Sequence, residues 1–519
     1  MANITKVYLM NCLLEKDYAH TLYFESQAAQ QAYFQQRIKS ALTFTDFSYQ
    51  RKDNIIRIPA HVDQLFSAKV NYCMYQNAQY SNKWFYAFVT DMQYVNDGCT
   101  EVHIQTDCIQ TWMFDYTVKH SFVEREHATT DTVGAHTIEE GLELGDYVCE
   151  SCTADGNLTS LKYILQVTEP VPPSDGNTVY ATNYGGIPHA GGAYICNTFS
   201  EVASIVNAYS GGGKADAVIA AYMIPAKIIN DSSGDMLYSG QTTPGRYDTT
   251  VTKPTTVNGY TPRNKKLLSF PFVYLSVSNN SGVANVYRYE FFSSSDCGFH
   301  VEGIPVIGGS IKNCPKYYKG VAVNQEEGIM CGKFPTLSWS ADLYTNWLTQ
   351  NSVNIAMGIG AGALQVVGGV ATVAATAGTG ASIGGAGIVG GVQSIASTLA
   401  QIHQQSFTPN SARGNTNGGD INTALGVNTF HYYKMTIRAE IARVIDEYFD
   451  MFGYKCNRVK VPAKNHRQSY WYTKTIDANI IGGIPQDDLQ TIKDCYNRGI
   501  TFWKTEEYYR NYSAPNAIV

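Results

Sequence analysis

The chain has 519 residues, a net charge of −6 and only 16 % charged residues, and it contains 37 tyrosines. This length exceeds what a single hydrophobic core supports, so we expect three or four domains. The sparse, slightly acidic charge excludes a protein that grips nucleic acid through clustered Lys and Arg. Abundant tyrosine favours β-rich domains whose surfaces neighbouring molecules cover, although an extracellular β-rich enzyme would have a similar composition.

The N-terminal part is predicted to consist of short strands and one helix. The apolar run from Val7 to Leu14 is followed at once by charged residues, so it predicts a first strand and not a secretory signal. The helix is expected over residues 28–42. Further strands are predicted at residues 54–60, 83–95 and 100–114, with a hairpin turn at 96–98 where the sequence reads Asn-Asp-Gly.

The middle part is predicted to mix short strands with Gly- and Ser-rich turns. A strand is expected at residues 270–279. A short helix is expected at residues 214–224, where Pro225 ends it.

The C-terminal part begins with a predicted amphipathic helix from Phe430 onward. Five apolar side chains fall on one face at helical spacing, namely Ile437, Ile441, Val444, Ile445 and Tyr448. A strand at 469–476, a helix from Pro485 to Gly499 and a strand at 500–503 are expected to follow.

We find no catalytic motif. Residues 209–216 superficially resemble a phosphate-binding loop, but the first glycine is missing and Ala215 stands where the magnesium-binding Ser or Thr belongs. The acidic pairs Glu139-Glu140 and Asp487-Asp488 are interpreted as solvated surface and as a complement to a helix dipole.

Metal sites are minor alternatives in this sequence. Cys149 and Cys152 form a lone CxxC, and His127 and His136 flank a loop rich in Thr and Asp. Free thiols are the better interpretation of the twelve scattered cysteines, which indicates folding in a reducing cytosol. We therefore predict no enzyme, no cofactor and no metal.

The most unusual segment lies between Asp342 and Arg413, where the chain contains no Asp, Glu, Lys or Arg. It holds two apolar stretches, Ile355–Val373 and Ile383–Leu399, each roughly 25–28 Å long at helical rise and so close to the thickness of a bilayer core. Small residues recur four apart, which lets membrane helices approach closely. A membrane-active helical hairpin and a Gly/Ala linker or buried core both stay open, because glycine costs about 1 kcal/mol per helical site in water.

In the membrane interpretation, the segment supplies two sets of site residues. The apolar residues expected to enter a membrane or plug a channel are Ile355, Met357, Ile359, Leu364, Val366, Val367, Val370, Val373, Ile383, Ile388, Val389, Val392, Ile395 and Leu399. The glycines expected between the helices are Gly358, Gly362, Gly380, Gly384, Gly387 and Gly391.

Two signatures near the ends of the chain resemble one family of bacteriophage proteins. They comprise residues 71–116, 122–127 (FVEREH) and 136–148 at the N-terminal side, and 448–462, 470–475 and 482–503 at the C-terminal side. In this order, around an apolar insert, they are similar to the tail knob, or distal tail tube, proteins of phi-29-like short-tailed bacteriophages of the podovirus type. The resemblance implies a hexameric β-rich tube at the tail tip, attached to the proximal tail (lower collar) protein, through which DNA leaves. It also implies long hydrophobic loops that close the tube before ejection.

Residues and resemblance together predict a mainly β multi-domain tube subunit with a few helices and a long hydrophobic loop insertion. The predicted segments are an N-terminal β-rich tube domain (1–160), a middle β domain (161–340), a charge-free hydrophobic loop (341–415) and a C-terminal α+β part that completes the tube (416–519). The protein would be a structural virion protein of the tail tip, assembled in the host cytoplasm as a homo-hexamer. Its loop would enter the host cell membrane, and its mildly acidic wall would let double-stranded DNA pass without specific binding. The alternatives are a tail adhesin, a cell-wall-degrading tail protein or a secreted pore-forming toxin.

Overall fold

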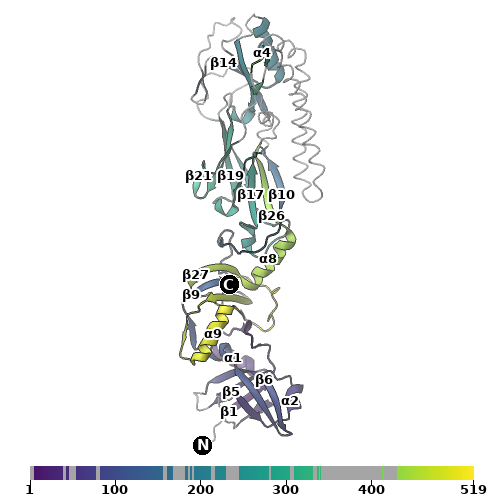
Figure 1. Ribbon diagram of the computed structural model, residues 1–519, viewed down its shortest axis with the longest axis vertical. Coiled ribbons are helices and arrows are strands. Elements are labelled where there is room, and N and C mark those ends of the chain that lie inside the picture. The colour runs from purple at the N-terminus through teal and green to yellow at the C-terminus, as the bar shows by residue number, and fades with distance from the viewer. Residues whose placement is uncertain are drawn as a thin grey trace. The chain divides into compact units, whose positions relative to one another are not determined.

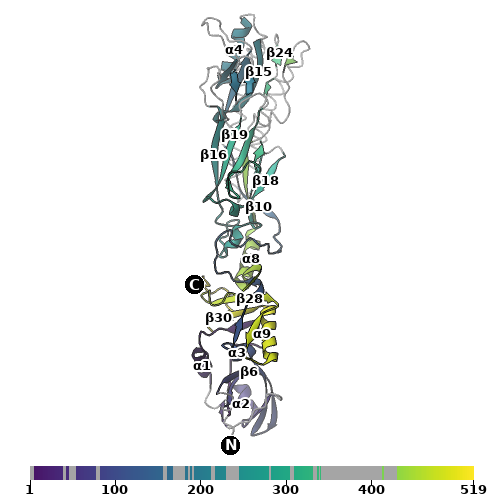
Figure 2. The same ribbon diagram turned by 90° about the vertical axis from the view of Figure 1, so that its left-hand side faces the viewer.

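The chain forms two compact units, each described here by itself (Figures 1 and 2). Unit 1 combines Met1–Leu142 with Arg443–Val519, and unit 2 is Glu143–Ala442. The computed structural model describes residues 5–38, 42–45, 54–77, 82–155, 160–167, 182–184, 187–189, 192–211, 217–229, 245–279, 282–303, 309–330, 336–337, 339–340, 412–413 and 429–519.

The first sheet of unit 1 is antiparallel and has six strands. In sheet order they are β3 (Thr43–Phe44), β1 (Thr5–Met10), β5 (Tyr72–Asn77), β6 (Trp84–Asn96), β7 (Cys99–Thr106) and β4 (Ile55–Ile58). The predicted strands at Val7, 54–60 and 83–95 are confirmed. So is the turn at 96–98, where the Gly98 N–H donates to Asn96 Oδ1 at 2.9 Å.

Two predictions in this region gave the wrong length. The predicted strand at 100–114 ends at Thr106, because Asp107 caps a short helix, α3 (Cys108–Trp112), by accepting the Gln110 N–H at 3.0 Å. The predicted helix at 28–42 is α1 (Gln27–Gln35), which buries only Gln30 and Phe34. The apolar spacing of Phe34 continues at Ile38, but the N–H groups of Arg37 and Ile38 bond carbonyls three residues back, so the helix closes in a tighter turn after Gln35. A further helix, α2 (Val62–Ser67), follows β4.

The second sheet of unit 1 joins the two ends of the chain. Its strands, in order, are β2 (His20–Leu22), β30 (Ile500–Trp503), β28 (Tyr470–Ile476), β9 (Ser121–Glu126) and β27 (Tyr454–Lys460). A small ladder pairs β8 (Tyr116–Val118) with β29 (Ile480–Gly482). The N-terminal purple and C-terminal yellow segments accordingly lie together in unit 1 (Figure 1).

The C-terminal elements of unit 1 follow the sequence prediction. The strands at 469–476 and 500–503 are β28 and β30, and the helix is α9 (Gln486–Arg498). Pro485 precedes α9, and Gly499 ends it at a φ of 97°, which glycine adopts without strain. Aromatic side chains fill the shared core; the Phe34 and Tyr72 rings, for example, stack with centroids 5.4 Å apart.

The described residues of unit 2 form three larger sheets. The first has β10 (Tyr147–Ala154), β26 (His431–Ile437), β17 (Val273–Ser278) and β18 (Ala284–Tyr287). The second has β16 (Gly245–Thr252), β19 (Asp296–Gly303), β20 (Ile311–Tyr318) and β21 (Val321–Val323), with β22 (Ile329–Met330) also paired to β20. The third has β14 (Gly192–Cys196), β11 (Leu161–Val167), β15 (Val218–Pro225) and β23 (Thr336–Leu337). The predicted strand at 270–279 corresponds to β17.

Shorter elements complete unit 2. They are the ladder of β12 (Thr182–Tyr184) with β13 (Ile187–His189), the ladder of β24 (Trp339–Ser340) with β25 (Ala412–Arg413), helix α4 (Phe199–Gly211), and the 3-10 helices η5 (Ala226–Ile228), η6 (Lys265–Leu268) and η7 (Tyr289–Phe291).

The predicted helix at 214–224 is wrong, because this segment forms strand β15. β15 is hydrogen-bonded by β11 on one side and by β23 on the other. Successive side chains such as Tyr222, Met223 and Ile224 are all buried. A strand that is covered on both faces lacks the apolar–polar alternation of a half-exposed strand, so its apolar run is easily mistaken for a helix.

The predicted helix from Phe430 is correct only in its second half. Residues His431–Ile437 form β26, and α8 spans Ala439–Phe452. The buried side chains of α8 include Ala442, Ile445 and Phe449, whereas Val444 is 66 % exposed. The predicted apolar face was therefore misplaced around the helix.

The observed architecture confirms the mainly β class with a few helices. The predicted division into four segments stays a proposal. β10 from the first predicted segment pairs with β26 from the last, and both strands belong to unit 2. Among the helices of the described residues, none is long and apolar enough to cross a membrane. Residues 341–411 lie outside the described ranges.

Candidate functional site at the base of the charge-free insert

The two ends of the charge-free insert are held next to each other by backbone pairing. β24 and β25 are antiparallel, with Trp339 opposite Arg413 and Ser340 opposite Ala412. The chain therefore leaves at residue 340 and returns at residue 412 from adjacent positions of one ladder. The apolar residues and glycines predicted to act in a membrane all lie between these points, outside the described residues, and their role stays a prediction.

The strands that flank this ladder belong to larger sheets of unit 2. Before it, β23 pairs with β15, with Thr336 opposite Tyr222 and Leu337 opposite Ala221. After it, the chain reaches β26, which lies between β10 and β17. The chain segments before and after the insert are therefore held by strands whose pairing does not involve the insert itself.

The sequence candidates for metal binding are not brought together. Within the described ranges, no group of three or more His, Cys, Asp or Glu side chains could hold a metal ion. Cys149 and Cys152 are both free thiols. Burial raises the pKa of Cys149 and raises that of Cys152 to about 11, so neither is the thiolate that reactivity and metal ligation require.

His127 has a structural position between β28 and α8. Its Nδ1 accepts the Tyr472 N–H at 2.7 Å, and its Nε2 donates to the Asp450 carbonyl at 3.0 Å. Both ring nitrogens are therefore occupied by backbone groups. His136 instead bonds the Thr130 carbonyl at 2.7 Å, so the two histidines do not form one site.

Acid is expected to destabilise unit 1 through His127. Burial lowers the pKa of His127 to about 3, below the value of about 6.5 in an unfolded chain. The folded state then binds fewer protons than the unfolded state between these values, so stability is lost as the pH falls below about 6.5, by about 2 kcal/mol at pH 5. Urea unfolding at pH 7.5 and pH 5 tests this: the loss on acidification should be about 2 kcal/mol smaller in His127→Asn than in the unaltered chain.

The exposed His120 provides the matched control, because His120→Asn should leave the pH dependence unchanged. The comparison between variants is needed because Asp107, whose pKa burial raises to about 6, acts in the opposite direction below that pH. Equal acid sensitivity in His127→Asn and the unaltered chain would contradict the assignment.

Comparison with known proteins places the whole chain in one group. Residues 236–517, more than half of the chain, match the family model described as Bacillus phage phi29, Tail knob protein gp9, C-terminal domain. The chain belongs to this tail knob family. Residues 3–117 also match the model described as Caudoviral major tail protein N-terminus. The resemblance inferred from the two terminal signatures is confirmed, and the protein is a structural component of the virion tail.

Individual tail knob proteins match over nearly the full length. The tail knob protein gp9 of Bacillus phage phi29 is 26 % identical, covering 97 % of this chain and 96 % of that protein. The tail knob protein gp9 of Bacillus phage PZA is 25 % identical with the same coverage. The structure of the bacteriophage C1 tail knob protein, gp12, matches with a TM-score of 0.68 at 16 % identity, covering 99 % of this chain and 100 % of that one, which shows a shared fold.

Each of the two acidic pairs in the tail knob signatures contains one exposed and one buried side chain. Glu139 is exposed, but Glu140 is buried as a side chain and forms an ion pair with Arg125. Asp487 is exposed in the first turn of α9, whereas Asp488 accepts the Trp112 indole N–H at 2.8 Å. The interpretation as solvated surface is therefore wrong for Glu140. Asp487 and Asp488 both lie in the first turn of α9, as the helix-dipole interpretation expects, although Asp488 is buried there. A tryptophan in an aromatic core requires an acceptor for its N–H, which was the available signal for Asp488.

Proposed function

We propose that six copies of this tail knob chain form a closed tube at the tail tip, attached to the proximal tail (lower collar) protein. The tube is a conduit for ejection of double-stranded DNA. Residues 341–411 plug its channel before ejection and then insert into the host cell membrane to aid genome entry.

The pairing of β24 with β25 is the observation that supports the proposed role of the insert. A segment whose ends leave from one ladder can move without disturbing the sheets on either side. Residues 343–412 contain no Asp, Glu, Lys or Arg. Each such side chain would cost about 2.5–3.5 kcal/mol at the centre of a bilayer, so their absence favours insertion. Inside the bilayer, backbone groups must bond internally, which favours helices there.

The charge of the chain supports a conduit that does not hold DNA. Proteins bind the phosphate backbone by releasing counterions through clustered Lys and Arg. This chain carries 38 such residues against 44 Asp and Glu. A tube built from it would let a duplex slide without specific binding.

Assembly is the direct test of the conduit. Electron microscopy of the purified protein is expected to show closed sixfold rings, with a mass of about 343 kDa for six copies of the 57.2 kDa chain. In a gel-shift assay at physiological salt, the rings should not retain double-stranded DNA. Threefold rings, open helical polymers or tight DNA retention would each contradict the proposal.

A further inference from the structure

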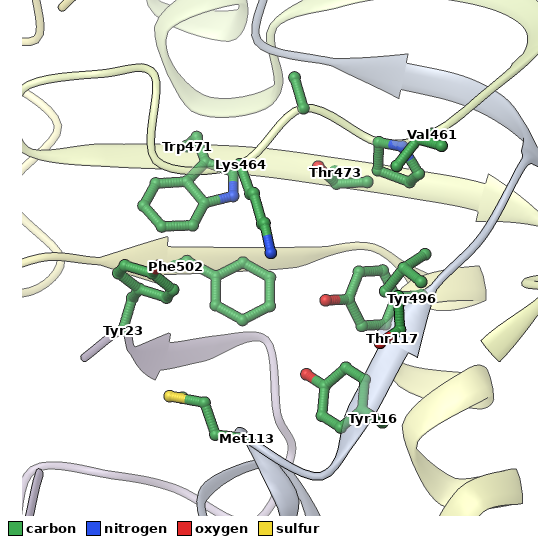
Figure 3. A pocket seen from close by; sticks show the side chains of 13 residues that line it. Tyr23, Met113, Tyr116, Thr117, Val461, Lys464, Trp471, Thr473, Tyr496 and Phe502 are labelled. Atoms are coloured by element: carbon green, nitrogen blue, oxygen red, sulfur yellow. The ribbon is translucent and has the colours of Figure 1, made fainter. Parts of the chain in front are cut away.

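Unit 1 contains a cavity of about 240 Å³ beside its second sheet (Figure 3). Its wall includes Trp471 of β28 and Phe502 of β30, whose rings are stacked with centroids 5.3 Å apart. The loop that follows β27, including Val461 and Lys464, lines another side. The neighbouring strands β28 and β30 hold the two rings in register, because Trp471 lies directly opposite Phe502.

Two polar groups of this cavity have no partner within the described part of the chain. Thr473 lines the cavity and is only 1 % exposed, yet its Oγ1 makes no hydrogen bond there. The exposed Lys464 makes no hydrogen bond or ion pair with the described residues, and its side chain extends over the cavity (Figure 3). A buried hydroxyl without a partner costs about 1–3 kcal/mol, so Thr473 favours a ligand that supplies one.

Tyrosine hydroxyls lie on the side of the cavity opposite the indole. Tyr116 and Tyr496 both line it, and their hydroxyls face into it (Figure 3). Burial raises the pKa of Tyr496 to about 12 and that of Tyr116 well above its ordinary value, so both stay protonated at neutral pH. The two hydroxyls hydrogen-bond each other, and because each can both donate and accept, the pair keeps further positions for a ligand.

We propose that this cavity binds a phosphorylated sugar or polyol unit. The Lys464 ammonium would hold the phosphate, since charge-assisted bonds to phosphate are the strong ones. Thr473 and the two tyrosines would bond hydroxyls, while the aromatic rings cover the apolar C–H face of the ligand. The inference is independent of the conduit and of the charge-free insert.

The volume of the cavity and the charge of its lining restrict the class of ligand. The cavity is smaller than the roughly 300–1,000 Å³ of pockets for drug-sized ligands, so it suits one sugar or polyol unit and not a nucleotide. Its lining contains one lysine and no Asp or Glu, which disfavours cations and favours a single anionic group.

Calorimetric titration of the full-length protein tests this assignment with glucose 6-phosphate, glucose and inorganic phosphate as probes. Glucose 6-phosphate is expected to bind at least about tenfold more tightly than glucose or inorganic phosphate. Only glucose 6-phosphate carries both a phosphate for Lys464 and sugar hydroxyls for Thr473 and the two tyrosines. Lys464→Gln should weaken its binding about tenfold, whereas the exposed Lys16→Gln should not change it.

Thr473→Val separates a binding role from a structural one. Because Oγ1 has no partner among the described residues, the change should leave the melting temperature equal or higher. It should nevertheless weaken glucose 6-phosphate binding several-fold. Unchanged affinity in both Lys464→Gln and Thr473→Val would overturn the proposal, as would equal affinity for inorganic phosphate and glucose 6-phosphate, or no binding at about 10 mM ligand.

A lipid headgroup and a free sugar or polyol phosphate carry the same chemical groups. Binding to vesicles that contain phosphatidylinositol distinguishes these two sources of the ligand. If the source is a lipid headgroup, the chain should bind these vesicles, and both glucose 6-phosphate and Lys464→Gln should abolish binding. If glucose 6-phosphate binds but the vesicles do not, the ligand is a sugar or polyol phosphate outside the membrane. Vesicle binding that neither glucose 6-phosphate nor Lys464→Gln changes would contradict a lipid headgroup as the ligand of this cavity.

Discussion

A chain in which a short Gly/Ser linker replaces residues 341–411 is expected to fold, assemble and melt at nearly the same temperature, but to lose dye release from liposomes. β24 and β25 already place Ser340 beside Ala412, so a linker of hairpin length can join them. Shortening a loop changes its closure free energy by only about 0.6 kcal/mol per halving of length. The two apolar stretches inside the deleted segment are the parts of the chain suited to crossing a bilayer, so their loss should abolish release.

Single charges test the same role without removing the segment. Val367→Asp or Ile388→Asp should each oppose insertion by about 3 kcal/mol at mid-membrane, or roughly a hundredfold. Val367→Ala is the matched control and should retain release. If the deleted chain misfolds, the segment belongs to a core and cannot be a detachable plug. If it folds and still releases dye, another part of the chain meets the membrane, and the proposed role of the insert fails.

The sequence predicted the fold well where local patterns decide the structure. The aromatic-rich run of β6 and the Asn-Asp-Gly turn placed the β6–β7 hairpin, and Pro485 with Gly499 placed α9. It failed at β15, because both faces of this strand are buried and it therefore has no polar face to reveal its period. The local pattern carries no information about which strands will flank it.

The roles of charged residues were less predictable than the elements that carry them. Glu140 and Asp488 each follow another acidic residue in a polar stretch, and nothing nearby distinguishes the buried member from the exposed one. Trp112 lies 376 residues from Asp488, and Arg125 lies 15 residues from Glu140 on another element, so both pairs meet only in the fold. The pairing of the two ends of the insert is equally a property of the fold, since β24 and β25 are too short for a sequence pattern.

Glu140 and Arg125 form an enclosed ion pair in unit 1. The Glu140 side chain is 1 % exposed and that of Arg125 is 9 % exposed. Glu140 also accepts the Lys455 N–H at 3.0 Å, while Arg125 donates to the Gly453 carbonyl at 2.8 Å. The pair therefore ties the segment after β9 to β27 and to the turn after α8.

Glu140→Gln is expected to lower the free energy of unfolding by about 3–5 kcal/mol, because it leaves the buried Arg125 guanidinium without its counter-charge. Glu139→Gln, one residue away and exposed, should change it by less than about 0.5 kcal/mol. Replacing both partners with Arg125→Met and Glu140→Leu should recover much of the loss, since an apolar pair needs no counter-charge. Urea unfolding of the four chains, the unaltered one included, measures all three changes. If Glu140→Gln is as stable as Glu139→Gln, water reaches the guanidinium and the pair does not hold these segments together.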